Sequence, residues 1–259
     1  SSTQKHTIED SMALQYDNKS MTAEAMVPVI TNIRSTAKIR HAINLLLNWD
    51  HRLDRDSAAA ALYDRWEQGM LLTLNKQLLP NRSASASQLI SRPKLMAWMI
   101  TPPEFVFGEN PKEGRDKMIS KHLGTAIESL NSEFGEDNWV YGDIHFSSIT
   151  HPLNALLDAD AKAALNIGPL PRGGGPNTLN ANHGNGSQTS GASFRIIADT
   201  ADWNTAVGTN TPGQSGDPSS PYYRNLFENW NKGDYFPLYF AKDVVEANTR
   251  DYIKLNPAP

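Results

Sequence analysis

The sequence predicts an α+β fold in which a mainly helical first half is followed by a half of strands and loops. Apolar residues recur at helical spacing through residues 1–135. In residues 136–259, short runs rich in β-branched and aromatic residues are separated by Gly, Pro and Asn. No internal repeat subdivides the chain. Residues 1–259 therefore form one region whose secondary structure is expected to change near residue 135.

Four helices are predicted in the first 80 residues. Thr7 followed by Asp10 is the pattern of a capping box, which predicts a helix that ends at Gln15. Apolar stripes at i, i+3 and i+4 predict two further helices, the first of which carries Pro28 in its first turns. The expected ranges are 7–15, 23–34 and 39–47, and a fourth helix begins at Ala58.

The segment before the fourth helix is acidic. Asp56 or Ser57 is expected to cap this helix, because a side-chain oxygen there accepts the unpaired N–H groups of the first turn. The alternative is a calcium loop, which needs carboxylates at alternate positions followed by Gly. Ala58 breaks that pattern, and the capping interpretation is favoured.

Two more features complete the first half. Residues 81–111 are rich in Ser, Pro and Asn, which predicts a long surface segment with one short helix over residues 95–99. Residues 113–133 carry the cleanest amphipathic pattern in the chain and predict a long helix.

The second half predicts short strands joined by long loops. Residues 140–149 are rich in β-formers, and residues 193–199 are the best candidate for a core strand. Residues 166–190 are expected to be mostly loop with one short strand over residues 178–181. A further strand is expected before Pro212, and a terminal helix over residues 243–248.

Composition excludes several classes of function. The 259 residues are 39% hydrophobic with a mean hydropathy of −0.50, and no apolar run approaches the roughly 20 residues that span a bilayer. The net charge is −4 and basic residues are scattered, which argues against nucleic acid as a partner. The chain has no Cys, so thiolate nucleophiles and Cys-bound metals are excluded, and this suits an oxidising compartment.

Two glycine-containing motifs invite a functional interpretation. In Gly213-Gln214-Ser215-Gly216 the serine resembles that of a nucleophile elbow, but Asp217 stands where the motif needs Gly, and a plain turn is favoured. Residues 173–175 are three glycines that could cradle a phosphate, yet no Lys-Ser or Lys-Thr pair follows them. A loop that needs a positive φ is the expected role.

Two further features concern His and Ser residues. His145 and His151 would share one face of a strand and could bind a metal ion with a carboxylate, but the sequence places no third ligand. Two hydrogen-bonded structural histidines are favoured. Ser1 could act as an N-terminal nucleophile with its own α-amine as base, if its amine is free.

Ten segments, taken in order, resemble the C-terminal part of the β chain in the penicillin amidase family of N-terminal nucleophile hydrolases. This family includes penicillin, cephalosporin and acyl-homoserine lactone acylases. The segments are residues 7–17 (TIEDSMALQYD), 46–50 (LLNWD), 56–60 (DSAAA), 139–145 (WVYGDIH), 151–153 (HPL), 173–174 (GG), 178–181 (TLNA), 191–199 (GASFRIIAD), 212–218 (PGQSGDP) and 220–223 (SPYY). Their order and spacing cover nearly the whole chain.

The resemblance implies part of a four-layer αββα architecture and a periplasmic or secreted precursor that cleaves itself into a heterodimer. It also implies hydrolysis of a small acyl-amide substrate, with a Ser nucleophile at the start of the β chain and an oxyanion hole formed partly by an Asn. The motifs for the nucleophile, the oxyanion Asn and the family's calcium site lie upstream of the matching segments. We therefore expect that no residue of this chain contacts the reacting atoms, and that the chain holds no metal site and no cofactor. Ser1 does not resemble the family's nucleophile.

One residue is carried over as a candidate. In the cephalosporin-acylase branch a carboxylate on the strand similar to residues 193–199 supports the catalytic centre, and Asp199 is the matching position. The alternative is a strand-end carboxylate that accepts backbone N–H bonds. Tyr222, where relatives often carry His, and Gly175-Pro176, where an acidic residue is common, depart from the family pattern and leave the substrate preference open.

The leading hypothesis is that the chain is part of an exported acylase whose active centre is completed by the remaining α and β polypeptide, so that the chain alone is inactive. Neither nucleic acid nor a membrane is expected as a partner. One alternative is a self-contained hydrolase that uses Ser1. The other is a non-catalytic binding or scaffold protein that retains the fold and makes contacts through the loop at residues 166–190.

Overall fold

The computed structural model describes residues 5–33, 36–80 and 90–256. The described residues form two compact units that interleave along the chain. We call residues 17–148 and 168–191 the helical unit, and residues 1–16, 149–167 and 192–259 the sheet unit. The change of composition near residue 135 does not divide these units, because the helical unit continues through it.

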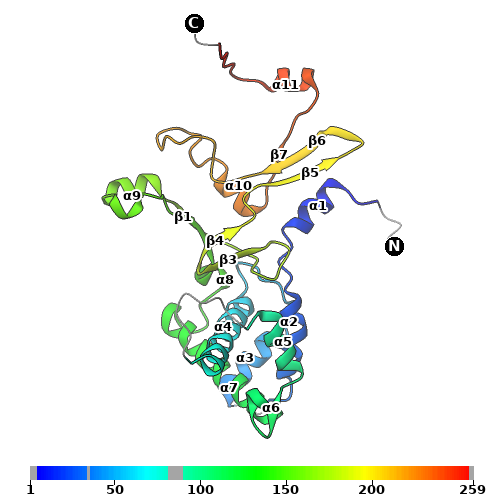
Figure 1. Cartoon of the computed structure of the whole chain (residues 1–259), viewed down its shortest axis with the longest axis vertical. Coiled ribbons are helices and arrows are strands. Elements are labelled where there is room, and N and C mark those ends of the chain that lie inside the picture. The colour runs from blue at the N-terminus through cyan, green and yellow to red at the C-terminus, as the bar shows by residue number, and fades with distance from the viewer. Residues whose placement is uncertain (1–4, 34–35, 81–89, 257–259) are drawn as a thin grey trace. The chain divides into compact units, whose positions relative to one another are not determined.

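The helical unit is built around one long helix, α4 (Ala58–Leu78), which packs against α3, α7 and α8 (Figure 1). Its core is apolar and includes Trp66 and Met70, both fully buried. The other helices of this unit are α2 (Met21–Met26), η1 (Val27–Ile30), α3 (Ala37–Leu47), α5 (Arg92–Ile100), α6 (Glu104–Phe107), α7 (Pro111–Phe134) and α8 (Tyr141–Ile144).

The locally encoded helices of this unit are confirmed. Helices α3, α4 and α7 lie where the apolar stripes predict them. Of the two proposed caps for α4, Ser57 is the one observed, and its Oγ accepts from the N–H of Ala60 at 3.1 Å. Asp50 and Asp54 in the preceding segment accept hydrogen bonds from Arg52, which agrees with the favoured interpretation of this segment as a structural one.

Three predictions in this unit are wrong in detail. The helix expected over residues 23–34 ends at Met26 and continues as the 3-10 helix η1, because Pro28 can sit only in a first turn; Arg34 lies outside the described residues. The segment after residue 90 contains two helices, α5 and α6, where one was expected. Residues 81–89 lie outside the described residues.

The third concerns residues 140–149, where a strand was expected throughout. Residues Tyr141–Ile144 instead form α8, because the Asp143 carboxylate accepts from the N–H of Val140 at 2.8 Å and closes a helical turn. The strand β1 (Phe146–Ile149) begins only after this turn.

A four-stranded sheet, in the order β2-β1-β4-β3, follows the helices of this unit. Its other strands are β2 (Ile167–Pro171), β3 (Asn182–Asn185) and β4 (Ser187–Gly191); β1 and β4 are parallel, β3 and β4 antiparallel. The prediction of mostly loop for residues 166–190 is therefore wrong. The strand expected over residues 178–181 is absent from the described segment there, and only an isolated bridge joins Ala181 to Gly175.

The glycine loop between β2 and β3 has the predicted positive φ, at Gly174 (φ 81°). A Cβ at Gly174 would lie 2.3 Å from the carbonyl oxygen of Asn180, so only glycine fits. The loop is thus shaped by close backbone approach.

The sheet unit contains a three-stranded antiparallel sheet, in the order β5-β6-β7, and α1 lies against β5 (Figure 1). The predicted capping box of α1 is confirmed: the N–H of Asp10 donates to Thr7 Oγ1 at 3.1 Å, and Asp10 Oδ2 accepts from the N–H of Thr7 at 2.9 Å. The elements are α1 (Ile8–Gln15), η2 (Asn154–Leu156), α9 (Ala159–Leu165), β5 (Arg195–Asp199), β6 (Asp202–Thr209), α10 (Phe227–Lys232), β7 (Phe236–Pro237) and α11 (Lys242–Asn248).

Strand β5 is a strand as predicted, but not a core strand. Phe194 and Ile196 are each 52% exposed, whereas Arg195 is buried. The guanidinium of Arg195 lies 4.2 Å from the ring centroid of Tyr16, and this stacking turns the arginine inward and the apolar neighbours outward. The strand before Pro212 (β6) and the terminal helix (α11) are confirmed, whereas α10 was not predicted.

In the part of the chain that the structure covers, every helix is too short or too polar to cross a bilayer.

Replacing the cap of α4 should destabilise the chain. Ser57→Ala removes the acceptor for the Ala60 N–H, and we expect a loss of about 1 kcal/mol in the free energy of unfolding, measured by urea denaturation. Ser132→Ala, at an exposed position inside α7, is the matched control and should change the stability by less than about 0.5 kcal/mol. Equal effects of the two substitutions would contradict the capping role.

Candidate functional site

The helical unit encloses a cavity of about 440 Å³ beside α4, which we call the α4 cavity. Its wall combines side chains of α4 and α5 with the segment around α8 and with β3. The lining residues are Asp64, Gln68, Leu71, Leu72, Arg92, Tyr141, Ile144, His145, Pro176, Asn182, His183, Gly184 and Gly186. The lining of this cavity is partly polar and partly apolar.

A buried ion pair joins α4 and α5 at the cavity, where Arg92 is a lining residue and Glu67 is not. Arg92 Nε donates to Glu67 Oε2 at 2.5 Å, and the Glu67 side chain is only 4% exposed. Tyr63 donates its hydroxyl to Glu67 Oε1 at 2.8 Å, so both carboxylate oxygens are bonded. Burial raises the pKa of Glu67, and the Arg92 charge opposes this rise. The charge of Arg92 is therefore already matched by a carboxylate in direct contact.

A second carboxylate, that of Asp64, lies on α4 about one helical turn before Glu67. Asp64 is half-buried at the cavity, and Gln68 Nε2 donates to its Oδ2 at 2.6 Å. Burial raises the pKa of Asp64, which the bond from Gln68 and the charges of Arg92 and Arg65 oppose. Because a carboxylate only accepts, the Gln68 atom that faces it is the amide nitrogen, and Gln68 Oε1 is left as a second acceptor.

His145 forms the opposite part of the wall and is buried. Its Nε2 lies 2.6 Å from Asn182 Oδ1, and its ring stacks on Tyr141 with centroids 4.8 Å apart. Asn182 Nδ2 donates to the carbonyl oxygens of Gly173 and Asn180, so its Oδ1 must accept and His145 Nε2 must carry the proton. Burial lowers the pKa of His145 to about 4, so the imidazole is neutral at pH 7 and its Nδ1 is an acceptor.

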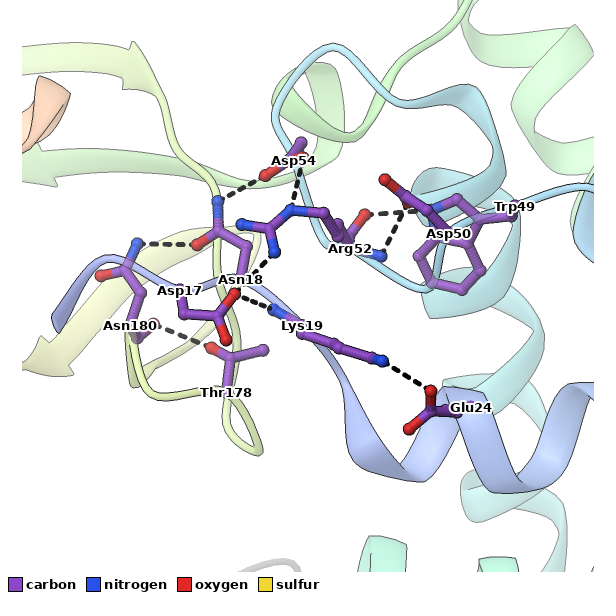
Figure 2. A network of polar contacts seen from close by, with 10 residues as sticks. All are labelled: Asp17, Asn18, Lys19, Glu24, Trp49, Asp50, Arg52, Asp54, Thr178 and Asn180. Atoms are coloured by element: carbon purple, nitrogen blue, oxygen red, sulfur yellow. Dashed lines mark hydrogen bonds and ion pairs between the residues drawn. The ribbon is translucent and has the colours of Figure 1, made fainter. Parts of the chain in front are cut away.

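A polar network connects this wall to the start of the unit (Figure 2). Arg52 bridges two carboxylates, donating to Asp17 Oδ1 at 2.7 Å and to Asp54 Oδ2 at 3.3 Å. Asn18 donates to Asp54 Oδ1 at 2.6 Å and accepts from Asn180 Nδ2 at 2.9 Å. Together with the Asn182–Asn180 bond, these contacts fix the loop that carries Asn182 against the segment around Arg52.

The structure does not place His145 and His151 on one strand face. His145 caps the end of α8 in the helical unit, whereas His151 belongs to the sheet unit, where its Nδ1 accepts from the N–H of Leu153 at 3.2 Å. Each is hydrogen-bonded, as the favoured structural interpretation expects. Across residues 5–33, 36–80 and 90–256, no group of three or more His, Asp or Glu side chains could hold a metal ion.

The other candidate residues also have local structural contacts. Ser215 lies in a turn, where its N–H donates to the carbonyl of Tyr222 and its Oγ accepts from the N–H of Asp217. Asp199 ends β5, is exposed, and its Oδ1 accepts from the N–H of Ala201 at 2.8 Å. Ser1 lies outside the described residues.

The α4 cavity itself was missed by the sequence reasoning. Asp64, Gln68 and Glu67 lie on the buried side of a helix that reads as apolar, and a charged residue within such a stripe is the signal that was available. Arg92 and Asn182 join them only through tertiary packing, which no local pattern records.

Comparisons with known proteins agree with this fold. The chain shares the fold of a thermostable penicillin G acylase from Alcaligenes faecalis, with a TM-score of 0.53 over 98% of this chain and 50% of that chain, at 14% sequence identity. The sequence model of the penicillin amidase family matches residues 1–247. The chain therefore belongs to the penicillin amidase family, as the ordered motifs indicate, and its α+β class is confirmed.

Curated relatives are acylases. The chain is 31% identical to an acyl-homoserine lactone acylase QuiP from Pseudomonas syringae pv. syringae, over 76% of this chain and 26% of the relative. It is 25% identical to QuiP from Pseudomonas aeruginosa, over 98% of this chain and 35% of the relative. It is 28% identical to a penicillin acylase 2 proenzyme from Pseudomonas sp., over 82% and 28%. The chain thus spans about a quarter to a third of the length of these relatives.

Arg92→Met should destabilise the chain strongly, because it leaves the Glu67 carboxylate buried with Tyr63 as its remaining partner among the residues that the structure describes. We expect a loss of about 3–5 kcal/mol in the free energy of unfolding, measured by urea denaturation. The double variant Glu67→Gln/Arg92→Met should be more stable than Arg92→Met, since no charge is then left buried.

Lys38→Met is the control for this experiment. It removes an exposed ion pair with Glu128 and should cost about 0–1 kcal/mol. A cost of Arg92→Met no larger than that of Lys38→Met would show that the pair with Glu67 is not buried in solution.

The neutral, buried His145 should make the chain less stable in acid. Its pKa falls from 6.5 to about 4 on folding, so the unfolded chain binds more protons between these pH values. The stabilisation is complete above about pH 6.5 and is lost as the pH falls toward 4, by about 3 kcal/mol in all. His145→Gln should remove this contribution and flatten the dependence of unfolding free energy on pH, measured by urea denaturation at several pH values.

His183→Gln is the matched control, because His183 lies at the same cavity but is exposed. It should keep the pH dependence of the unsubstituted chain. An imidazole of His145 that titrates near 6.5 by NMR would contradict the burial argument even if the glutamine variant fails to fold.

Proposed function

We propose that this chain is the C-terminal part of the β chain of an exported acylase, and that it hydrolyses acyl amides only together with further polypeptide. The observation that carries the proposal is the family match over residues 1–247 combined with coverage of only about a quarter to a third of the curated relatives. In this proposal the nucleophilic Ser, its α-amine base and the oxyanion donor lie on residues outside the chain.

The candidate residues support this division of roles. Ser57 caps a helix and Ser215 closes a turn, so the two serines that local patterns single out have structural contacts. Asp199 remains the one candidate for a supporting carboxylate, with its bond to the Ala201 N–H as the structural alternative. In this proposal the chain contributes structural support for the reacting groups of the assembled enzyme.

The other parts of the proposal concern partners and location. The partners are the remaining α and β polypeptide, produced by self-cleavage of a precursor, and a small acyl-amide substrate. The calcium site of the assembled enzyme is proposed upstream of this chain. The location is periplasmic or secreted, which a chain free of Cys would tolerate.

Two other functions are alternatives to this proposal. A self-contained hydrolase would use Ser1 as nucleophile, and a scaffold protein would keep the fold without chemistry and bind through residues 166–190. The nucleophile position in the full-length gene product separates them, because a scaffold needs no Ser, Thr or Cys there.

The test compares the 259-residue chain with the full-length gene product. Both are assayed with an acyl-homoserine lactone and with a penicillin, and both are treated with a serine-directed sulfonyl fluoride before peptide mass analysis. We expect turnover only by the full-length product, with the label on a Ser outside residues 1–259. Ser215→Ala, which changes only a turn, should leave turnover in place.

The outcomes distinguish the proposals. Turnover by the chain alone with label on Ser1, abolished by Ser1→Ala, would establish the first alternative. A full-length product with neither turnover nor label, and with no Ser, Thr or Cys at its nucleophile position, would favour the scaffold.

A further inference from the structure

The three-stranded sheet of the sheet unit has an apolar face at the point where β5, β6 and β7 pair (Figure 1). Residues that pair directly across antiparallel strands point to the same face of a sheet. Ile196 pairs with Gly208, and Gly208 pairs with Phe236, so these three residues share one face. Leu238 lies over Gly208 on this face, because its Cδ1 would be 3.0 Å from a Cβ built there. We call Ile196, Gly208, Phe236 and Leu238 the apolar face.

The opposite face of the same sheet carries polar residues and is covered. Arg195 pairs with Thr209, and both alternate with the residues of the apolar face, so they point the other way. Both are buried. Tyr16, at the end of α1, stacks on the Arg195 guanidinium, and its hydroxyl donates to the carbonyl oxygen of Trp230 in α10. Tyr16 therefore connects α1 to α10 at the polar face.

This arrangement is the reverse of a sheet that has one face in water. Such a sheet turns its polar side chains to water and its apolar side chains to the core. Here the covered residues are Arg195 and Thr209, whereas Ile196 is 52% exposed and Phe236 and Leu238 are only half-buried. No residue of the apolar face carries a charge. A face of this kind is expected to pack against another apolar surface.

The comparisons with known proteins indicate where that surface comes from. The matched penicillin G acylase chain shares its fold with 98% of this chain through only 50% of its own length. The matches cover 26% and 35% of two curated relatives. These relatives therefore contain polypeptide that has no counterpart in the 259 residues.

A second copy of this chain is the other apolar surface to weigh. A stable interface between separate proteins takes about 20–30 residues a side, and the apolar face has four. Polypeptide of the same gene product packs on so small a face more readily, because a covalent link lowers the entropy lost on association. The size of the face thus favours an occupant from the same gene product.

We propose that the apolar face is the surface on which the remaining polypeptide of the full-length gene product packs, through apolar side chains that contact Ile196, Phe236 and Leu238. This inference rests on the proposed function, which places further polypeptide beside this chain, and it names the surface that receives it. The face that carries Arg195 keeps its contacts with Tyr16 in the assembled enzyme.

Hydroxyl-radical footprinting tests the proposal on the full-length gene product and on the 259-residue chain. Oxidation of Ile196 and Phe236 is measured by peptide mass analysis. We expect oxidation of Ile196 to be about fivefold lower in the full-length product, in proportion to a fall of its exposed fraction from 52% to about a tenth. Leu153, which is 55% exposed in the same unit but lies outside the sheet, is the internal control and should be oxidised equally in both proteins.

Equal oxidation of Ile196 in the two proteins would overturn the proposal. Protection of Ile196 in the 259-residue chain alone at high concentration would also overturn it, since a second copy would then cover the face. The readout is independent of catalysis. Turnover without protection of Ile196 removes this inference and leaves the acylase proposal standing, whereas protection without turnover does the reverse.

A substitution provides the second test. Ile196→Glu places a carboxylate in the proposed contact, and we expect the full-length product to be cleaved by thermolysin at least about tenfold faster. The same substitution in the 259-residue chain should change the rate less than about threefold, because residue 196 is already half in water there.

Leu153→Glu is the matched control, because Leu153 is equally exposed and lies outside the sheet. It should change the cleavage rate of either protein less than about threefold. Unchanged resistance of the full-length Ile196→Glu variant would contradict the proposal, and footprinting of the unsubstituted protein decides if this variant does not fold.

Discussion

The hydrogen bond between His145 Nε2 and Asn182 Oδ1 determines much of the helical unit. It joins the end of α8 to the start of β3, and it fixes which imidazole nitrogen carries the proton. Asn182 donates both of its amide hydrogens to carbonyl oxygens, of Gly173 and Asn180, and this orients its Oδ1 toward His145. Buried hydrogen bonds that share members reinforce one another, so these contacts hold the loop, the tautomer and the cavity wall together.

The helices could be predicted from the sequence because their signals are local. Caps such as Thr7 and Ser57, and apolar stripes such as that of α7, lie within a few residues of the helix they specify. The strands β3 and β4 could not, because their residues are polar and glycine-rich and have no alternating pattern. β3 pairs with the adjacent β4, and β4 also pairs with β1 far along the chain, as in the register between Ser147 and Gln188.

Which side chains of β5 are buried could not be predicted from the sequence, for a related reason. Its apolar residues suggest a core strand, but the residue that turns inward is Arg195, which stacks on Tyr16 from the other end of the chain. The candidate site, likewise, could be predicted only in part from the sequence. The order of motifs identifies the family, whereas the α4 cavity depends on Glu67 matching Arg92 and on Asn182 meeting His145, contacts that exist only in the folded unit.

The interleaving of the two units affects how the chain can fold during synthesis. The chain passes between the units after residues 16, 148, 167 and 191, and everything from residue 192 onward belongs to the sheet unit. All segments of the helical unit have therefore been synthesised before β5. A nascent chain can complete the helical unit first, with residues 149–167 as an insertion, whereas the three-stranded sheet can form only after its last strand, β7, has been synthesised.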